Sequence, residues 1–405
     1  MIKGIFLLFV LISGFLRSSA GESALLVSTK AEGQYEVAES TELASFPKLS
    51  WEKKLSKPVT ASAISKDGTK VAIADETGTL SVYNATGEKL WEYHYEGKLP
   101  EHTSEFRPVK ADTAIFDIKF SGSGKFIVCD LMIITPRKYE EHIGGYKPYK
   151  KLCFDMEGKL LWDTSKRGNH TIGGDKYILI RDIQSLDEER PIDYYVLGMD
   201  GKVIYTGKTI GHENNCQGFS EDLRYMFVDN KVIECKNWQP IWEFKEKDGG
   251  NILGIRGNHI LVTSGWKGDR VYEITSWKKL LDIGESLFES LTDNYIANIV
   301  WGKSEKRDVL RVIEIKTGNI VLKRQYKNGD IQWHNKLLLH TASDEKHLVL
   351  GSEKGVLFYE LKSGKSWELP LKIREYSFFN FYSVSENGEA VLFGYDRSVK
   401  LYKSF

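Results

Sequence analysis

Tyrosine and arginine side chains gather in four long segments that separate apolar, strand-like stretches in the first half of the chain. The segments are residues 93–112, 131–150, 182–193 and 207–215. They carry the candidate binding residues Tyr95, Arg107, Arg137, Tyr139, Tyr146, Tyr149, Arg190 and His212. Tyrosine and arginine combine rigid contact area with hydrogen-bonding groups, and they anchor many interfaces. Their content therefore favours recognition of a protein or peptide.

Five of the nine histidines lie in or beside these segments, namely His94, His102, His142, His170 and His212. Imidazoles that converge on one rim can bind a metal or titrate near neutral pH. No pair of them has the spacing of ligands on one strand or helix, so convergence would depend wholly on the fold. We predict no metal site and no cofactor.

The common catalytic motifs are missing from the sequence. It contains no GxSxG elbow, no HExxH and no GxxxxGK[ST] phosphate loop. An enzyme can also assemble its site from single residues on separate elements. The sequence therefore favours a binding function and leaves catalysis open as the alternative.

A recurring hairpin must position the four segments. It is clearest in "GTLSVYNATGEKLWEYH" (78–94), with close copies at 151–165 and 193–207 and weaker copies later in the chain. Another hairpin precedes each copy, for example at 61–75 and 380–396. Four short strands that recur every roughly 35 to 50 residues are typical of a β-propeller, in which each unit is one blade. The predicted fold is a single all-β propeller.

Eight blades are predicted from their first strands, which begin near Ala61, Ala114, His170, Cys216, Gly250, Glu285, Ile331 and Tyr376. The last blade is one strand short. The stretch "FPKLSWEKKL" (46–55) reads like a fourth strand without a hairpin partner, so we expect it to complete the eighth blade and close the ring. Seven blades remain the alternative, because the fourth and fifth are weakly patterned.

The propeller topology assigns the connections to two faces. Connections between strands one and two, and three and four, are short and share one face, whereas the four long segments fall on the other face, around blades 1 to 3. Long loops on a rigid scaffold commonly carry binding sites. We therefore expect a loop-rich binding face there.

The pattern "G-x-L-x-V-Y-N-x-x-G-x-x-L-W" (78–91) resembles the PQQ-like propeller repeat, and "AISKDGTKVAIADETG" (63–78) resembles WD-repeat propellers. The resemblance covers nearly all of the chain after residue 45. It implies the propeller fold and leaves two roles open: a quinoprotein-like enzyme with its site at the central channel, or a non-enzymatic scaffold. Scaffolds of this kind include the propeller lipoprotein of the BAM complex, which is similar in length. The chain lacks the adjacent Cys pair of the quinoprotein alcohol dehydrogenases and the lipid-anchor Cys of that lipoprotein.

The N-terminus differs from the rest. Lys3, the apolar run "GIFLLFVLISGFL" and the small residues Ser18 and Ala20 are typical of a signal peptide over residues 1–20. An uncleaved anchor is the alternative, although the run is short for a bilayer span. We expect an N-terminal segment at 21–45, a propeller at 46–405, and an exported protein that is periplasmic, at the cell surface or extracellular.

Composition restricts the partners further. The formal net charge is zero, which gives no reason to expect nucleic acid or an anionic membrane. The rest of the chain has no apolar run that could span a bilayer, and we expect a monomer. Of the four cysteines, Cys129 and Cys153 are expected on adjacent antiparallel strands, where a disulfide is open to them if the register aligns them.

Overall fold

The structure is a computed structural model that describes the propeller. The described residues are 48–97, 102–104, 107–109, 112–134, 146–166, 168–182, 191–210, 217–244, 250–263, 268–284, 286, 288–302, 307–327, 339–341, 345–352, 355–361, 363–370 and 381–403. They lie within the compact unit Ser40–Phe405. None of the described segments forms a helix of the length and apolarity that a bilayer span needs. The predicted signal peptide (1–20) and the segment 21–45 lie outside the described residues.

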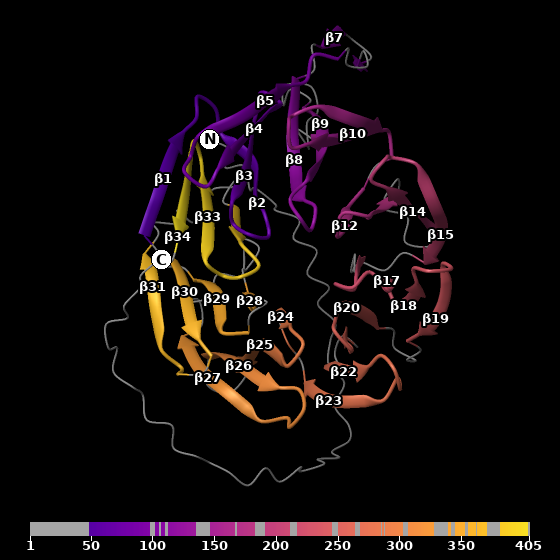
Figure 1. The fold of residues 1–405 in the computed structure, drawn as a ribbon, viewed down its shortest axis with the longest axis vertical. Coiled ribbons are helices and arrows are strands. Elements are labelled where there is room, and N and C mark those ends of the chain that lie inside the picture. Colours follow the sequence, from indigo (N-terminus) through magenta and orange to yellow (C-terminus); the bar gives the residue numbers. More distant parts are fainter. Residues whose placement is uncertain are drawn as a thin grey trace, which may run out of the picture. The chain divides into compact units, whose positions relative to one another are not determined.

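Eight four-stranded antiparallel sheets surround a central axis, as the sequence predicted (Figure 1). From the axis outward, blade 1 consists of β2 (Val59–Ile64), β3 (Lys70–Asp75), β4 (Thr79–Asn84) and β5 (Lys89–His94), and blade 2 of β8 (Asp112–Phe120), β9 (Phe126–Ile134), β10 (Tyr146–Asp155) and β11 (Leu160–Thr164). Blade 3 consists of β12 (His170–Gly173), β13 (Tyr177–Asp182), β14 (Pro191–Gly198) and β15 (Val203–Ile210), and blade 4 of β16 (Gln217–Phe219), β17 (Tyr225–Val228), β18 (Lys231–Glu234) and β19 (Gln239–Glu243).

Blades 5 to 7 continue the same order around the ring. Blade 5 consists of β20 (Asn251–Arg256), β21 (His259–Thr263), β22 (Asp269–Glu273) and β23 (Lys279–Gly284). Blade 6 consists of β24 (Phe288–Leu291), β25 (Tyr295–Gly302), β26 (Arg307–Glu314) and β27 (Ile320–Lys327). Blade 7 consists of β28 (Leu339–Thr341), β29 (His347–Ser352), β30 (Gly355–Glu360) and β31 (Ser366–Pro370). A separate two-stranded hairpin, β6 (His102–Ser104) and β7 (Arg107–Val109), lies between blades 1 and 2 in the sequence.

Blade 8 is closed by the N-terminal strand, which confirms the predicted closure. It contains β32 (Phe381–Val384), β33 (Ala390–Tyr395) and β34 (Ser398–Lys403), and β1 (Lys48–Lys54) pairs antiparallel with β34. The hydroxyl of Ser398 also donates to Glu52 at 2.8 Å. Because β1 fills the last open position, the two ends of the propeller share one sheet.

The inner hairpin turns repeat one serine contact. In four blades a buried serine hydroxyl accepts a hydrogen bond from the backbone N–H five residues later; these serines are Ser65, Ser121, Ser220 and Ser385. In three of these turns the same hydroxyl donates to an Asp or Asn two residues on. The contact fixes the turn, and it explains why S-x-D or S-x-N recurs in the sequence.

The outer hairpin turns of blades 1 to 5 take two forms. In blades 1 to 3 the turn glycine has positive φ and sits on a tryptophan of the preceding blade's outermost strand: Gly87 on Trp51, Gly158 on Trp91 and Gly201 on Trp162. In blades 4 and 5 the turn residue is instead a tryptophan with positive φ, Trp238 (φ 58°) or Trp277 (φ 55°). Trp238 stacks on Tyr205 and Trp277 on Trp242, with ring centroids 5.3 Å and 4.9 Å apart.

The two cysteines of blade 2 do not form the disulfide that the sequence left open. In the β9–β10 pairing Cys129 lies opposite Leu152, and Cys153 lies opposite Val128. This offset of one residue sends the two thiols to opposite faces of the sheet. Cys129 packs in the core shared with blade 1, Cys153 in the core beside blade 3, and both are free. Cys235 is also free, and Cys216 lies outside the described residues.

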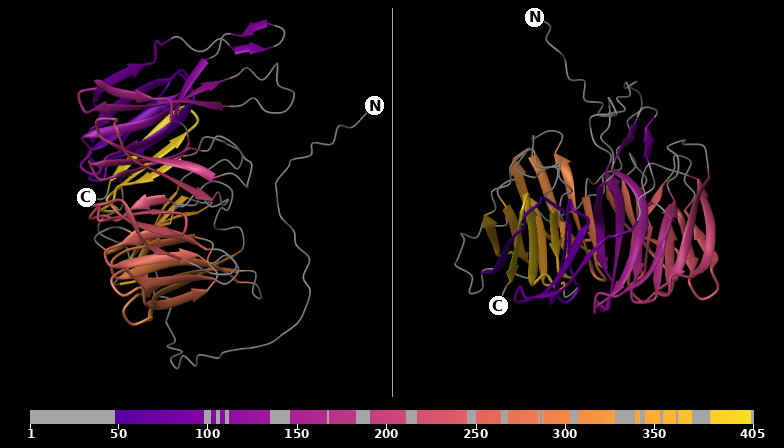
Figure 2. Two further views of the ribbon diagram at one scale, coloured as in Figure 1. Left: turned by 90° about the vertical axis from the view of Figure 1, so that its right-hand side faces the viewer. Right: turned by 90° about the horizontal axis from the view of Figure 1, so that it is seen from above.

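The connections differ sharply between the two faces. On the face that carries the inner and outer hairpin turns, which we call the turn face, two to five residues join consecutive strands. All longer connections leave the opposite face, which we call the long-connection face, and β6–β7 projects on that side (Figure 2). The four predicted segments belong to it. Connections 328–338 and 371–380, which flank blade 7, are of similar length, so the expectation that long connections gather around blades 1 to 3 is wrong.

Candidate functional site

Two of the predicted binding residues meet at the base of the long-connection face. Tyr95 follows β5, Tyr149 lies in β10, and their rings form an edge-to-face pair with centroids 6.3 Å apart. Burial, together with the hydrogen bond to Tyr149, raises the pKa of Tyr95 to about 12. Both rings are partly buried against the core between blades 1 and 2. The pair therefore fixes where the connections of these blades leave the scaffold.

The other predicted residues are not tested by the described side chains. Arg107 lies in β7 and Tyr146 in β10, but only their backbone is described. Arg137, Tyr139, Arg190 and His212 lie outside the described residues. These six stay predictions.

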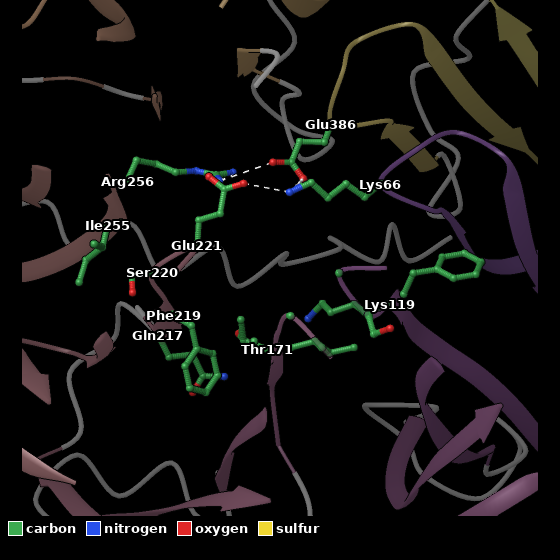
Figure 3. Close-up of a pocket in the computed structure, with 18 of the residues that line it drawn as sticks. Lys66, Lys119, Thr171, Gln217, Phe219, Ser220, Glu221, Ile255, Arg256 and Glu386 are labelled. Atoms are coloured by element: carbon green, nitrogen blue, oxygen red, sulfur yellow. Dashed lines mark hydrogen bonds and ion pairs between the residues drawn. The ribbon is translucent and has the colours of Figure 1, made fainter. Parts of the chain in front are cut away.

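A cavity of about 670 Å³ occupies the central channel. The innermost strands line it, with Lys119, Thr171, Gln217 and Phe219 among the lining residues (Figure 3). This mixture of apolar, hydroxyl and amide groups forms the wall of the ring. Channel residues were not among the predicted site residues.

Four charged side chains cross the channel on the turn face (Figure 3). Lys66 lies 2.9 Å from Glu221 and 2.7 Å from Glu386, and Arg256 lies 3.1 Å from Glu221 and 3.6 Å from Glu386. We call this set the ionic square. Since Lys66 and Glu386 belong to blades 1 and 8, and Glu221 and Arg256 to blades 4 and 5, the square joins opposite walls of the ring.

Every charge of the ionic square is matched within it. Hydrogen bonding to Lys66 lowers the pKa of Glu221. Partial burial alone would lower the pKa of Lys66, but the hydrogen bonds to Glu386 and Glu221 outweigh it and raise the pKa. The square therefore offers no uncompensated charge to a ligand, and it obstructs the turn-face end of the channel.

A second polar cluster lies between blades 2 and 3, with His170 and Lys151 buried and Asp117 and Lys119 at its exposed side. His170 Nδ1 lies 3.2 Å from Asp117 and 3.4 Å from Asp130, and the three side chains offer ligand atoms within 4.8 Å of one another. The fully buried Lys151 donates to Asp130 and lies 3.3 Å from His170 Nδ1, and Lys119 pairs with Asp117 at 3.0 Å.

These contacts put an ammonium group where a metal ion would bind. Two lysines neutralise the two carboxylates, and a metal would displace Lys151 from its partner inside the protein, at a high desolvation cost. Burial lowers the pKa of His170, and the hydrogen bond to Asp130 does not compensate. The cluster therefore fits an internal ion-pair network better than a resident metal.

A buried carboxyl pair joins blades 5 and 6. Glu289 in β24 is hydrogen-bonded to Asp269 in β22, and burial, followed by this contact, raises the pKa of Glu289 to about 9. One proton shared between two such groups avoids two adjacent buried charges. Glu289 also lines the channel, where it presents a neutral carboxyl at pH 7.

Sequence reasoning missed the ionic square, although a signal for it exists. Lys66, Glu221 and Glu386 occupy the same place in the inner hairpin, directly after the buried serine, in S-K-D-G, S-E-D-L and S-E-N-G. Opposite charges at one repeat position indicate contact across a ring. The partners become evident only when the blade count is known.

These features define an eight-bladed β-propeller whose channel is crossed by the ionic square. No protein-family model and no curated protein matches the chain. Among solved structures it is similar to the C-terminal WD40 domain of Sif2, with 12% identity over 88% of this chain and 99% of that chain and a TM-score of 0.56. It is also similar to BamB from Moraxella catarrhalis, with 11% identity over 88% of this chain and 100% of that chain and a TM-score of 0.54. At these identities the likeness shows the fold alone.

Proposed function

We propose that the protein is an exported, non-enzymatic binding scaffold that presents its long-connection face to a protein or peptide partner. The observation that carries this proposal is the asymmetry of the ring. Turns of two to five residues cover one face, and every longer connection leaves the other. A rigid ring that holds long connections on one side resembles other scaffolds whose loops carry recognition.

The described side chains support this proposal at one place. The Tyr95–Tyr149 pair locks the base of two long connections onto the core. Preorganised loops bind with a smaller entropy loss than free ones. Arg107, Arg137, Tyr139, Tyr146, Arg190 and His212 are the proposed contacts beyond that base.

A connection replacement tests the choice of face. Residues 135–145 are replaced by a two-residue hairpin turn, and the partner is identified by cross-linking the purified full chain in extracts of its own source. We expect cross-links at the long connections and loss of the partner in the replaced variant. The matched control, Lys125→Gln in the β8–β9 turn, should bind as before. Cross-links confined to the turn face would contradict the proposal, as would a stoichiometric chromophore or metal in the purified protein.

Export is tested separately. We propose that the signal peptide is removed after Ala20, so the N-terminal sequence of the protein recovered from its source should begin at Gly21. An intact Met1 in the recovered protein would contradict cleavage and favour the anchor.

A further inference from the structure

The exposed aliphatic side chains of the propeller share one level of the ring. Every large hydrophobic residue that is exposed among the described residues lies within the first three residues of an outermost strand. All of them directly follow an outer hairpin turn except Leu49, which lies in the N-terminal strand β1. Equivalent positions in successive blades are related by rotation about the ring axis. These side chains therefore lie on one circle, at the turn-face edge of the propeller.

A repeated β-bulge exposes most of them. In blades 1 to 6 the pairing between the third and fourth strands skips one residue close to the hairpin turn, and in each blade that residue is aliphatic: Leu90, Leu161, Ile204, Ile241, Leu280 and Val321. They are 38–46% exposed. The other three exposed aliphatics, Leu49, Val203 and Ile320, lie one residue from a skipped position. A β-bulge protects an edge strand from pairing with another chain whichever side chain it carries. The fold therefore does not explain why all six bulge residues are aliphatic.

The charge around this circle differs between its two halves. In blades 1 and 3 the neighbouring lysines are paired, Lys89 with Glu92 at 2.6 Å and Lys202 with Asp200 at 3.3 Å. In blade 2 the exposed Lys159 forms no ion pair within the described residues, but the exposed Glu157 lies in the same turn. The circle is therefore electrically mixed in blades 1 to 3.

In blades 4 to 6 the turn carboxylates fold back. Asn237 donates to Glu234, Ser276 to Glu273 and Thr317 to Glu314, at 2.8, 2.5 and 2.5 Å. Within the part of the chain that the structure describes, the exposed lysines of these turns form no ion pair; they are Lys236, Lys278 and Lys316. Lys279 alone is paired at this level, with Asp282 at 3.4 Å. Each of the three blades thus presents an unpaired lysine of its turn beside exposed aliphatic groups, one in blades 4 and 5 and two, Ile320 and Val321, in blade 6.

We propose that this sector, formed by Lys236, Ile241, Lys278, Leu280, Lys316 and Val321, docks on an anionic phospholipid bilayer. We call it the basic rim. Its aliphatic groups are a blade apart and project singly from bulges, which suits insertion into a bilayer interface. Positions on one circle can meet a flat surface together, and unpaired lysines beside them attract anionic headgroups. A net charge of zero over the whole chain is compatible with this local excess of unpaired lysines.

The test measures sedimentation of the full chain with vesicles of phosphatidylglycerol and phosphatidylcholine in equal parts. We expect binding that weakens as salt rises, because screening reduces the attraction. The triple variant K236Q/K278Q/K316Q should partition at least about a hundredfold less, at roughly fivefold per lysine. I241S/L280S/V321S should also lose binding, and L90S/L161S/I204S, the matched control from blades 1 to 3, should bind like the original chain.

Several results would overturn the proposal. One is an equal loss of vesicle binding in I241S/L280S/V321S and L90S/L161S/I204S. The others are unchanged binding of K236Q/K278Q/K316Q and equal binding of the original chain to vesicles of pure phosphatidylcholine. The N-terminal apolar stretch is common to all variants, so binding through it would leave every triple unchanged. Sedimentation velocity without lipid distinguishes a second copy of the chain as the occupant, since self-association that only the basic-rim triples abolish would assign the surface to a dimer. Thermal unfolding of each variant checks its fold, and the lysine triple provides the test if the serine triple does not fold.

Discussion

Neighbouring blades cover an aromatic ring of an outermost strand in two different ways. The joints of blades 8 and 1, 1 and 2, and 2 and 3 form a first group, and the joints of blades 3 and 4 and of 4 and 5 form a second. In the first group a glycine backbone covers a tryptophan, and the turn closes between residues three apart, as from Gly87 N to Asn84 O. In the second group a tryptophan ring covers the aromatic ring, and the turn closes between residues four apart, as from Trp277 N to Glu273 O. The common requirement is a covered aromatic ring, which either backbone or side chain can satisfy.

Each solution has its own weakness. Glycine tolerates positive φ freely but leaves no room for a side chain. Tryptophan at positive φ stores about 1 kcal/mol or more of backbone strain, and stacking plus burial must offset it. Buried polar groups also differ from joint to joint. The joint of blades 2 and 3 pairs carboxylates with lysines, whereas the joint of blades 5 and 6, which follows the second group, pairs two carboxyls.

The largest effect is expected at the charged joint of blades 2 and 3. Asp130→Asn removes the carboxylate charge that pairs with the buried ammonium of Lys151 and leaves it with neutral acceptors and the charge of Asp117. Removing one partner of a buried pair costs about 3–5 kcal/mol of unfolding free energy. Urea unfolding at pH 7 measures it. Asp163→Asn, which removes the exposed partner of Lys150, should cost at most about 1 kcal/mol. Similar losses in both variants would contradict the network.

The glycine joints provide the next test. An added Cβ at Gly201 (φ 77°) would lie 2.7 Å from Trp162 Cγ. Gly201→Ala should therefore combine backbone strain with overpacking and cost about 2–4 kcal/mol. At Gly318 (φ 72°) the nearest atom, Leu281 Cδ1, is 3.5 Å away, so Gly318→Ala should lose only about 1 kcal/mol. Equal losses by chemical denaturation would show that the tryptophan contact adds nothing.

The tryptophan joints should respond in the opposite order. Trp277→Ala removes the ring and keeps the strained backbone, whereas Trp277→Gly removes both. We expect losses of about 2–3 kcal/mol and about 1–2 kcal/mol respectively. The difference is measured from denaturation midpoints at constant slope. If the glycine variant is the less stable of the two, strain at Trp277 is not part of this joint.

The smallest effect is a gain in stability that depends on pH. The pKa of Glu289 is raised in the folded protein to about 9, from 4.5. Its favourable contribution is therefore complete below about pH 4.5 and is lost as pH rises through 9. Glu289→Gln should raise the unfolding free energy at pH 8 by at least about 1 kcal/mol. At pH 4 it should change little, and a gain of equal size at both pH values would exclude titration of Glu289 as its cause.

The sequence predicted the propeller because the repeated hairpin is a local signal. The closing strand and the first strands of blades 1 to 6, within three residues, followed from counting that hairpin, whereas β28 and β32 begin eight and five residues after the predicted Ile331 and Tyr376. The weak pattern of blades 4 and 5 has a cause, since Trp238 and Trp277 replace the expected glycine. The disulfide question depended on a register of one residue, which strand patterns do not resolve. The ionic square joins residues that meet only across the closed ring. The repeat position after the buried serine marks three of its members, but their partners follow only from the blade count.

The closing strand also governs how the chain folds. Lys48 pairs with Lys403, so the sheet of blade 8 requires both ends of the propeller. Such a non-local pairing forms late, because loop closure entropy must be overcome before the contact is gained. Until then β34 has an unpaired edge and Trp51 has no Gly87 to cover it. A nascent chain is therefore prone to pair that edge with another chain, and any delay before β1 reaches β34 would prolong this stage.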